Sequence, residues 1–208
     1  MKNHKIAALA VLAAAAAGCA GMVGSTDDTH AKAVAMMKAS FKEHGQAKLD
    51  RLDQDEMQRI CSDIHGDRVL ARDVAGRLEQ EQQAKIKYPA DGKLLGDWKQ
   101  GERIAQTGVG MQYSDDPKQP AGGNCYACHQ LTKAEVSYGT IGPSLYNFGK
   151  LRGFTPATQK YAYGKVYNSQ AFSACSSMPR FGHSGILTEK QIQDVVALLM
   201  DPESPVNK

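Results

Sequence analysis

Hydrophobic residues follow three different patterns along this chain. Residues 6–17 are apolar without a break. Residues 27–96 carry isolated apolar side chains near helical spacing among many charges. From residue 97 onward, two clear helical patterns flank a long stretch rich in glycine, proline and aromatic residues. The patterns predict an N-terminal hydrophobic segment, a helical extension over 27–96 and a helical domain over 97–208.

The N-terminal segment has the features of a secretory signal peptide over residues 1–20. Lys2 and Lys5 precede the apolar run, and small residues follow it. The run is too short for a membrane span, which needs about 20 apolar residues. Ala17-Gly18-Cys19 resembles the end of a bacterial lipobox, whose cysteine carries a lipid; ordinary cleavage is the alternative. Either route predicts export to the periplasm, with or without a membrane anchor at Cys19.

The extension over residues 27–96 predicts helices with narrow apolar faces. It holds 12 Lys/Arg and 13 Asp/Glu but only two aromatic residues. Helices of this kind need another surface to pack against. We therefore expect an extension and not an independently stable domain. Its apolar positions near helical spacing are Val34, Met37, Phe41, Leu49, Leu52, Met57, Ile60, Val69, Leu70, Val74 and Leu78.

Two helices are predicted in the C-terminal domain. The first covers 97–107, with Asp97 as its N-cap. The second covers 188–200, where Thr188 and Gln191 have capping-box spacing. The segment between them has many glycine, proline and aromatic residues and little strand alternation, which is too loop-rich for an apolar core alone, so we expect a large flat group to complete the core. The apolar face of the second helix is formed by Ile192, Val195, Val196 and Leu199.

Composition and charge exclude some classes of protein. The chain has 208 residues, of which 42% are hydrophobic and 23% charged. This balance is typical of a folded protein and excludes wholesale disorder. The formal net charge of +3 is too small to indicate nucleic-acid binding.

The motif Cys125-Tyr126-Ala127-Cys128-His129 carries the chemistry. A C-x-x-C-H run places two thiols to form thioether bonds with haem and puts the next histidine beneath the ring as an iron ligand. We therefore predict one covalent haem c attached to Cys125 and Cys128, with His129 on the iron. A thioredoxin-like redox pair would need a βαβ setting that the surrounding sequence lacks.

A zinc site and a structural disulfide would also use the cysteines of this motif. A zinc site needs four ligands, and Cys175 with His183 matches no familiar ligand pair. A disulfide between Cys125 and Cys128 would leave His129 without a role. Both interpretations therefore explain less of the motif than haem does.

The sixth iron ligand must come from elsewhere in the chain. Met178 lies in the polar loop Ser176-Ser177-Met178-Pro179, which Pro179 stiffens. A methionine in such a loop is less often a core side chain than one on a helix, so Met178 is the predicted ligand. His183 and an open iron position are the alternatives. Ligation by histidine and methionine raises the reduction potential and closes the iron to small substrates, which favours electron transfer.

Cys61 and Cys175 are the cysteines left over after export and haem attachment. Exported proteins meet oxidising conditions, so we predict a disulfide between these two residues. Two free thiols and a bond to a partner subunit are the alternatives. The predicted bond would fasten the extension to the loop that carries Met178.

Residues 97–201 resemble a class I cytochrome c. The resemblance rests on the helix around Gly101, the C-x-x-C-H motif, the segment Gly142-Pro143-x-Leu145, the Met178-Pro179 loop and the closing helix. It implies an all-α class I cytochrome c fold around one covalent haem, preceded by the helical extension. It also implies that the Pro143 carbonyl accepts a hydrogen bond from His129. In one departure, Leu198 or Leu199 replaces the aromatic residue that packs on the glycine of the first helix.

Three phrases are more specifically similar to the SoxX family, the small cytochrome subunits of the SoxAX complex of bacterial thiosulfate oxidation. This resemblance implies a heterodimer with a larger SoxA-like cytochrome subunit and the activity of an L-cysteine S-thiosulfotransferase. The chain would have no catalytic residue of its own. It would accept electrons as thiosulfate is joined to a carrier-protein cysteine, and pass them to a soluble cytochrome. The phrases are Gly123-Asn124-Cys125-Tyr126-Ala127-Cys128-His129, Gly139-Thr140-Ile141-Gly142-Pro143-Ser144-Leu145 and Ser177-Met178-Pro179-Arg180-Phe181-Gly182.

Two further classes of function are open to a cytochrome c. One is a free-standing periplasmic electron shuttle without an enzyme partner. The second is a haem enzyme such as a peroxidase, which needs a catalytic acid or base beside an open iron. No Asp or Glu lies between Glu135 and Glu189, so the sequence does not favour this class.

Residues 136–188 contain basic residues but no carboxylate. We expect an electropositive surface that attracts acidic partner proteins, with tyrosines adding contact area. The alternative is that these cations neutralise the haem propionates or are simply solvated. The cations are Lys150, Arg152, Lys160, Lys165 and Arg180, and the tyrosines are Tyr161, Tyr163 and Tyr167.

Overall fold

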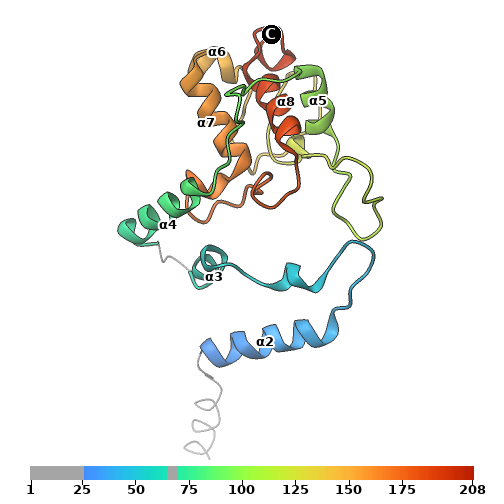
Figure 1. Ribbon diagram of the computed structural model, residues 1–208, viewed down its shortest axis with the longest axis vertical. Coiled ribbons are helices and arrows are strands. Elements are labelled where there is room, and N and C mark those ends of the chain that lie inside the picture. Colours follow the sequence, from blue (N-terminus) through green and yellow to red (C-terminus); the bar gives the residue numbers. More distant parts are fainter. Residues whose placement is uncertain (1–25, 65–69) are drawn as a thin grey trace, which may run out of the picture. The chain divides into compact units, whose positions relative to one another are not determined.

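A computed structural model describes residues 26–64 and 70–208 of the chain (Figure 1). These residues form seven α-helices and no β-strand, in agreement with the predicted all-α fold. The predicted signal peptide, including Cys19, lies outside the described residues. In the part of the chain that is described, no helix is long and apolar enough to cross a membrane.

The chain divides into two compact units. In the described residues, the smaller unit comprises 26–43 and 48–53, and the larger comprises 44–47 and 54–208. Residues 54–96 of the predicted extension therefore belong to the same compact unit as the predicted haem domain.

The smaller unit consists of helix α2 (Thr26–Ser40) and a single 3-10 turn, η1 (Leu49–Leu52). Lys38 Nζ lies 2.5 Å from Asp53 Oδ1, and both side chains are largely exposed. An ion pair so open to solvent contributes little to stability.

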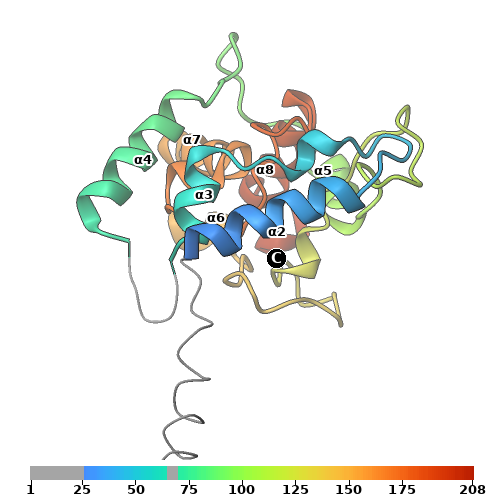
Figure 2. The same ribbon diagram turned by 90° about the horizontal axis from the view of Figure 1, so that it is seen from below.

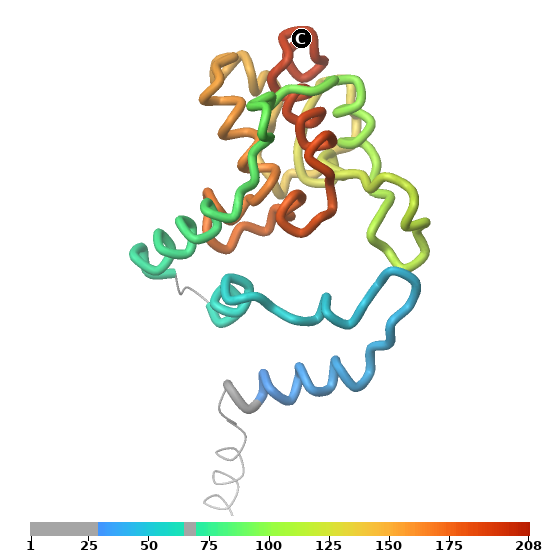
Figure 3. Tube along the Cα trace, viewed as in Figure 1, coloured from blue at the N-terminus to red at the C-terminus, as the bar shows by residue number. Residues whose placement is uncertain are grey.

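The larger unit is built around helix α8, which lies between α5 and α7 (Figures 1 and 2). Figure 3 traces the long irregular segment 107–147 that joins α5 to α6 and carries the C-x-x-C-H motif. The helices of this unit are α3 (Glu56–Ser62), α4 (Arg72–Ala84), α5 (Trp98–Gln106), α6 (Phe148–Arg152), α7 (Pro156–Tyr167) and α8 (Glu189–Met200), with 3-10 turns η2 (Cys125–Ala127), η3 (Ser169–Ala171) and η4 (Pro205–Asn207).

Helices α5 and α8 begin at the predicted caps. The Asp97 side chain accepts a hydrogen bond from the Lys99 backbone N–H, and Thr188 with Gln191 forms a complete capping box. Each cap satisfies backbone donors that the first turn of a helix leaves free. The apolar face of α8 is buried, with Ile192 and Leu198 completely inaccessible to solvent.

Gly101 allows α5 and α8 to touch. A Cβ atom at residue 101 would lie 2.7 Å from the Asp194 carbonyl carbon and 3.0 Å from Leu198 Cβ. Leu198, not an aromatic residue, therefore lies against this glycine. Asp194 adds a polar contact, because its Oδ1 accepts from the Asp97 backbone N–H at 2.7 Å and also pairs with Lys190.

Helix α7 was not predicted by the hydrophobic pattern. Its buried residues Ala162, Tyr163, Gly164 and Val166 are four of five successive positions, which is more than one narrow stripe, and the helix packs against both α8 and η3. The sequence does contain a start signal, since Thr155 caps the helix and Pro156 is its first residue.

Candidate haem-binding site

The C-x-x-C-H motif forms a tight turn at the end of α5. Asn124, with a φ of 45°, reverses the chain into η2, and the Cys125 carbonyl accepts from the backbone N–H groups of Cys128 and His129. The preceding residues are bonded to the end of α5, with Gly123 N–H donating to the Ile104 carbonyl at 2.8 Å. The turn therefore holds both thiols and the histidine on a rigid support.

Cys125 and Cys128 are both free thiols, which argues against a disulfide within the motif. Cys125 packs against the hydrophobic core, and burial raises the pKa of its thiol to about 12. A thiol that stays neutral at pH 7 is unlike the activated thiolate of a redox pair. Cys175 is bonded to Cys61, so it cannot complete a zinc site with His183.

The orientation of His129 is set by Pro143. Its Nδ1 donates a hydrogen bond to the Pro143 carbonyl oxygen at 2.7 Å. Nε2 is then the nitrogen with the free lone pair, which is the arrangement a metal-ligating histidine needs. Gly142 lies against the imidazole ring, and its N–H donates to the Cys128 carbonyl at 2.8 Å.

Met178 lies on a loop between η3 and α8 and packs against the same core as Cys125. The loop is fixed by its neighbours, because Ser169 Oγ donates to the Met178 carbonyl oxygen at 2.5 Å and Met178 N–H donates to Ser176 Oγ at 3.3 Å. Sequence reasoning missed Ser169, since nothing in a serine nine residues upstream indicates this contact.

His183, the alternative ligand, lies further along the same loop. Burial, together with the nearby cations Arg180 and Lys85, lowers the pKa of this histidine. Its backbone N–H donates to the Tyr167 carbonyl at 3.0 Å.

The predicted disulfide between Cys61 and Cys175 is present. The two Sγ atoms are bonded at 1.96 Å, and the residues are 114 positions apart in the sequence. The bond joins the end of α3 to the loop that carries Met178.

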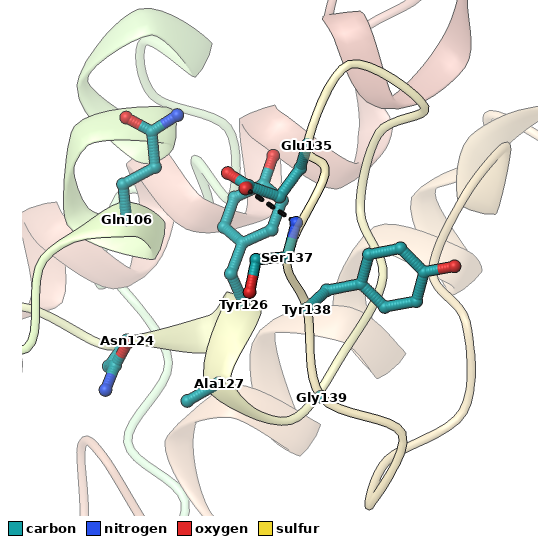
Figure 4. Close-up of a pocket in the computed structure, with 8 residues that line it drawn as sticks. All are labelled: Gln106, Asn124, Tyr126, Ala127, Glu135, Ser137, Tyr138 and Gly139. Carbon is teal, nitrogen blue, oxygen red and sulfur yellow. Dashed lines mark hydrogen bonds between the residues drawn. The ribbon is translucent and has the colours of Figure 1, made fainter.

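A polar hollow of about 450 Å³ lies beside the haem motif (Figure 4). Tyr126 is the buried aromatic residue of its wall, and its hydroxyl lies 3.4 Å from Thr132 Oγ1. Glu135 accepts from the Ser137 backbone N–H at 3.2 Å, and the Tyr138 ring points away from Tyr126. Its lining residues are Gln106, Asn124, Tyr126, Ala127, Glu135, Ser137, Tyr138 and Gly139.

The expected basic surface is smaller in the structure than the sequence suggests. Arg180 is only 10% exposed and pairs with Asp55. Lys165 donates to the Ser169 carbonyl, and burial lowers the pKa of its amine. Tyr163 is completely buried, so it adds no contact area for a partner.

The remaining cations of this surface, Lys150, Arg152 and Lys160, are exposed, and the last two lie beside aromatic rings. Lys160 Nζ lies 5.1 Å from the centre of the Tyr88 ring, and Arg152 lies over the rings of Phe148 and Tyr161. Such contacts leave the charges accessible while ordering the side chains.

Comparison with known proteins decides the family. The cytochrome c family profile matches residues 118–201. An uncharacterized lipoprotein from Aquifex aeolicus (strain VF5) is 41% identical over 158 residues, which cover 74% of this chain and 73% of that protein. Residues 118–201 belong to the cytochrome c family.

A cytochrome c domain implies covalently bound haem c, and the residues of this one fit that group. Two free thiols stand at the spacing that thioether attachment requires, next to a histidine whose Nδ1 is bonded to Pro143 and whose Nε2 accepts no hydrogen bond from the residues that the structure describes. The glycine at 142 leaves room for the imidazole in this orientation. Bound haem supplies one-electron oxidation and reduction, so the chain is a haem electron-transfer protein.

Proposed function

We propose that this cytochrome c binds one haem, with His129 and Met178 as the axial iron ligands. The observation that carries the proposal is the Nδ1 bond from His129 to Pro143, which leaves Nε2 for the iron. The position of Met178 also supports the proposal, because its loop is anchored against the core that also contacts Cys125. Two protein ligands close the iron to small molecules and favour electron transfer.

Met178 ligation is tested by Met178→Ala in the haem-loaded protein. We expect loss of the sulfur-to-iron charge-transfer absorption in the near red and a lower reduction potential. Met111→Ala is the matched control, because Met111 is another methionine of the haem domain outside the proposed ligand set. A Met178→Ala spectrum identical to that of the wild type would overturn the assignment.

We further propose that the chain is the small cytochrome subunit of a SoxAX-like L-cysteine S-thiosulfotransferase. The support is the likeness of three phrases to the SoxX family, and the first two of these phrases meet in space. The Gly139 N–H donates to the Tyr126 carbonyl, and the Gly142 N–H donates to the Cys128 carbonyl, both at 2.8 Å. The partner would be a larger SoxA-like cytochrome subunit in the periplasm.

The chemistry of the complex explains why an electron carrier is needed. Joining a thiol to thiosulfate forms a sulfur–sulfur bond and releases one proton and two electrons. One haem iron takes up one electron at a time, so the electrons must leave through carriers such as this chain and then a soluble cytochrome. The thiosulfate carrier protein would meet the larger subunit and not this chain.

Native mass spectrometry of the complex isolated from its source tests the subunit role. We expect this chain with one haem, bound to a second and larger cytochrome. Addition of thiosulfate and the carrier protein should reduce the haem of this chain in the complex, whereas sulfate should not. A monomer with one haem and no cytochrome partner would instead identify a free-standing electron shuttle.

The same mass measurement reports on Cys19. A diacylglycerol mass on the mature N-terminus would identify a lipoprotein, and a chain that begins after the signal peptide without added mass would identify ordinary cleavage.

A further inference from the structure

We propose that residues 54–64 and 70–88, here called the brace, hold the Met178 loop in place for iron ligation, and that the Cys61–Cys175 disulfide is the covalent part of this brace. The inference rests on Met178 being the sixth ligand, as proposed above. It gives a role to the part of the extension that belongs to the same compact unit as the haem domain.

Helix α4 holds the start of the loop. Asn168 Nδ2 donates to Gln82 Oε1 at 3.0 Å, and both side chains are buried. Gln83 Nε2 donates to the Ala171 carbonyl at 2.9 Å. The bond between Asn168 and Gln82 is shielded from water, so its groups are costly to leave unpaired and it fixes the position of the chain there.

Two contacts anchor the loop just before Met178. Glu79 Oε1 accepts from the Ala174 backbone N–H at 2.8 Å. The next residue, Cys175, is bonded to Cys61 at the end of α3. A carboxylate acceptor makes the first of these contacts stronger than a neutral hydrogen bond, and the second is covalent.

One contact anchors the loop just after Met178. Arg180 Nη1 lies 2.6 Å from Asp55 Oδ2, and the arginine side chain is only 10% exposed. Asp55 is itself fixed, because it caps α3 in a complete capping box with Gln58. Met178 therefore lies between two anchors of the brace, three residues after Cys175 and two before Arg180.

The brace contacts the segment of the haem domain that contains Met178. Within the described residues, every hydrogen bond from 54–88 to the later part of the chain ends between residues 168 and 180. With both ends of a short segment fixed, the methionine sulfur stays at high effective concentration near its binding position. A longer free loop would lower that concentration.

Competition with imidazole tests the brace in the ferric, haem-loaded protein. Imidazole takes the sixth iron position when the methionine leaves, so its apparent affinity reports how often the loop opens. We expect Glu79→Ala to raise this affinity about tenfold, the usual effect of losing one charge-assisted hydrogen bond. The double variant Cys61→Ser/Cys175→Ser should also raise it, because it releases the covalent anchor three residues before Met178. The near-red absorption should also fade at lower temperature than in the wild type.

Two variants on the same helix separate positioning from general stability. Glu79→Gln keeps an acceptor oxygen for the Ala174 N–H and should restore an imidazole affinity close to that of the wild type. Glu81→Ala removes a carboxylate whose partner among the described residues is Arg77 of the same helix, so it should leave the affinity unchanged. If the double cysteine variant does not fold, Glu79→Ala and Glu79→Gln still test whether the brace positions Met178.

The outcomes distinguish this inference from the proposed function. Suppose that the near-red absorption depends on Met178, but Glu79→Ala and the double cysteine variant both bind imidazole as the wild type does. This result would overturn the positioning role of the brace and leave the ligand assignment intact. Near-red absorption that persists in Met178→Ala would overturn the ligand assignment, and the brace with it.

Discussion

The imidazole ring of His129 occupies the space that a side chain on residue 142 would need. A Cβ atom there would lie 2.5 Å from Nδ1 and 2.7 Å from Nε2, closer than the 3.0 Å limit that real Cβ atoms keep. Glycine at 142 therefore allows the ring to donate to Pro143 and to keep Nε2 free.

Gly142→Ala should displace the His129 ring and break its bond to Pro143. We expect a smaller fraction of haem-loaded protein, and altered electron paramagnetic resonance of the ferric iron in the fraction that carries haem. Mass spectrometry and resonance spectra provide the measurements. Gly76→Ala is the control, because a Cβ atom at that position of α4 meets no atom within 4 Å. Normal loading and an unchanged spectrum in Gly142→Ala would contradict the prediction.

Loss of the disulfide should destabilise the larger unit. Cys61 and Cys175 are 114 positions apart, and in the chain-entropy model a loop of this size is worth about 4–5 kcal/mol of unfolding free energy. Denaturant unfolding of Cys61→Ser/Cys175→Ser, followed by circular dichroism, measures this difference. A loss below about 1 kcal/mol would contradict the prediction, because it would show that the disulfide does not limit the freedom of the unfolded chain as the chain-entropy model requires.

Asp55 should make stability depend on pH in acid. Burial disfavours its charged form, but the Gln58 backbone N–H and the Arg180 guanidinium outweigh this, with help from Lys85, so the pKa of Asp55 falls below its ordinary value of 3.8. His183 also faces this group. Because the folded-state pKa is depressed, the contribution is present above the ordinary value and is lost as the pH falls through the folded-state pKa.

Asp55→Asn tests this contribution while it keeps a residue suited to capping α3. We expect a loss of about 1 kcal/mol of unfolding free energy at neutral pH, a modest figure because the Asp55 side chain is 36% exposed. The difference from the wild type should shrink as the pH falls below about 4. Equal stabilities at both pH values would show that the Arg180 pair contributes nothing net.

The exposed cations of α6 and α7 should speed reactions with anions. Reversal of Lys150, Arg152 and Lys160 to glutamate should slow oxidation of the ferrous haem by ferricyanide several-fold at low salt, with little difference at high salt. Stopped-flow absorbance over a range of ionic strengths gives the rates. Lys93→Glu, at a side chain that is 79% exposed and near Asp91, is the control for net charge. Rates that coincide at every salt concentration would remove a steering role from this surface.

The elements that the sequence predicts best are those with both a cap and one apolar face. Helix α8 has its capping box at Thr188 and a continuous buried face, and it was predicted to within one residue. Helix α7 has a clear start at Thr155 but buries residues on several faces, so periodicity did not reveal it. The haem-attachment cysteines and the disulfide were predictable for a different reason, because cysteine spacing and the number of cysteines left over do not depend on packing.

The non-covalent contacts of the brace were beyond sequence reasoning. Glu79 binds a backbone N–H, which has no signature in the residue type of Ala174. Arg180 was predicted to lie on a docking surface, because no carboxylate is near it in the sequence. Its acidic partner, Asp55, is 125 residues away. Ion pairs between distant segments become visible only when the fold brings the segments together.

The position of the disulfide also constrains how the protein matures. The loop closed by Cys61 and Cys175 contains both haem cysteines, Cys125 and Cys128. Four thiols can pair in three complete ways, and each of these consumes the two thiols that haem requires. Oxidation must therefore stop after a single bond, with one pair oxidised while the second pair is kept reduced until haem is attached. The same chain must therefore have one cysteine pair oxidised and the other kept reduced in the same compartment.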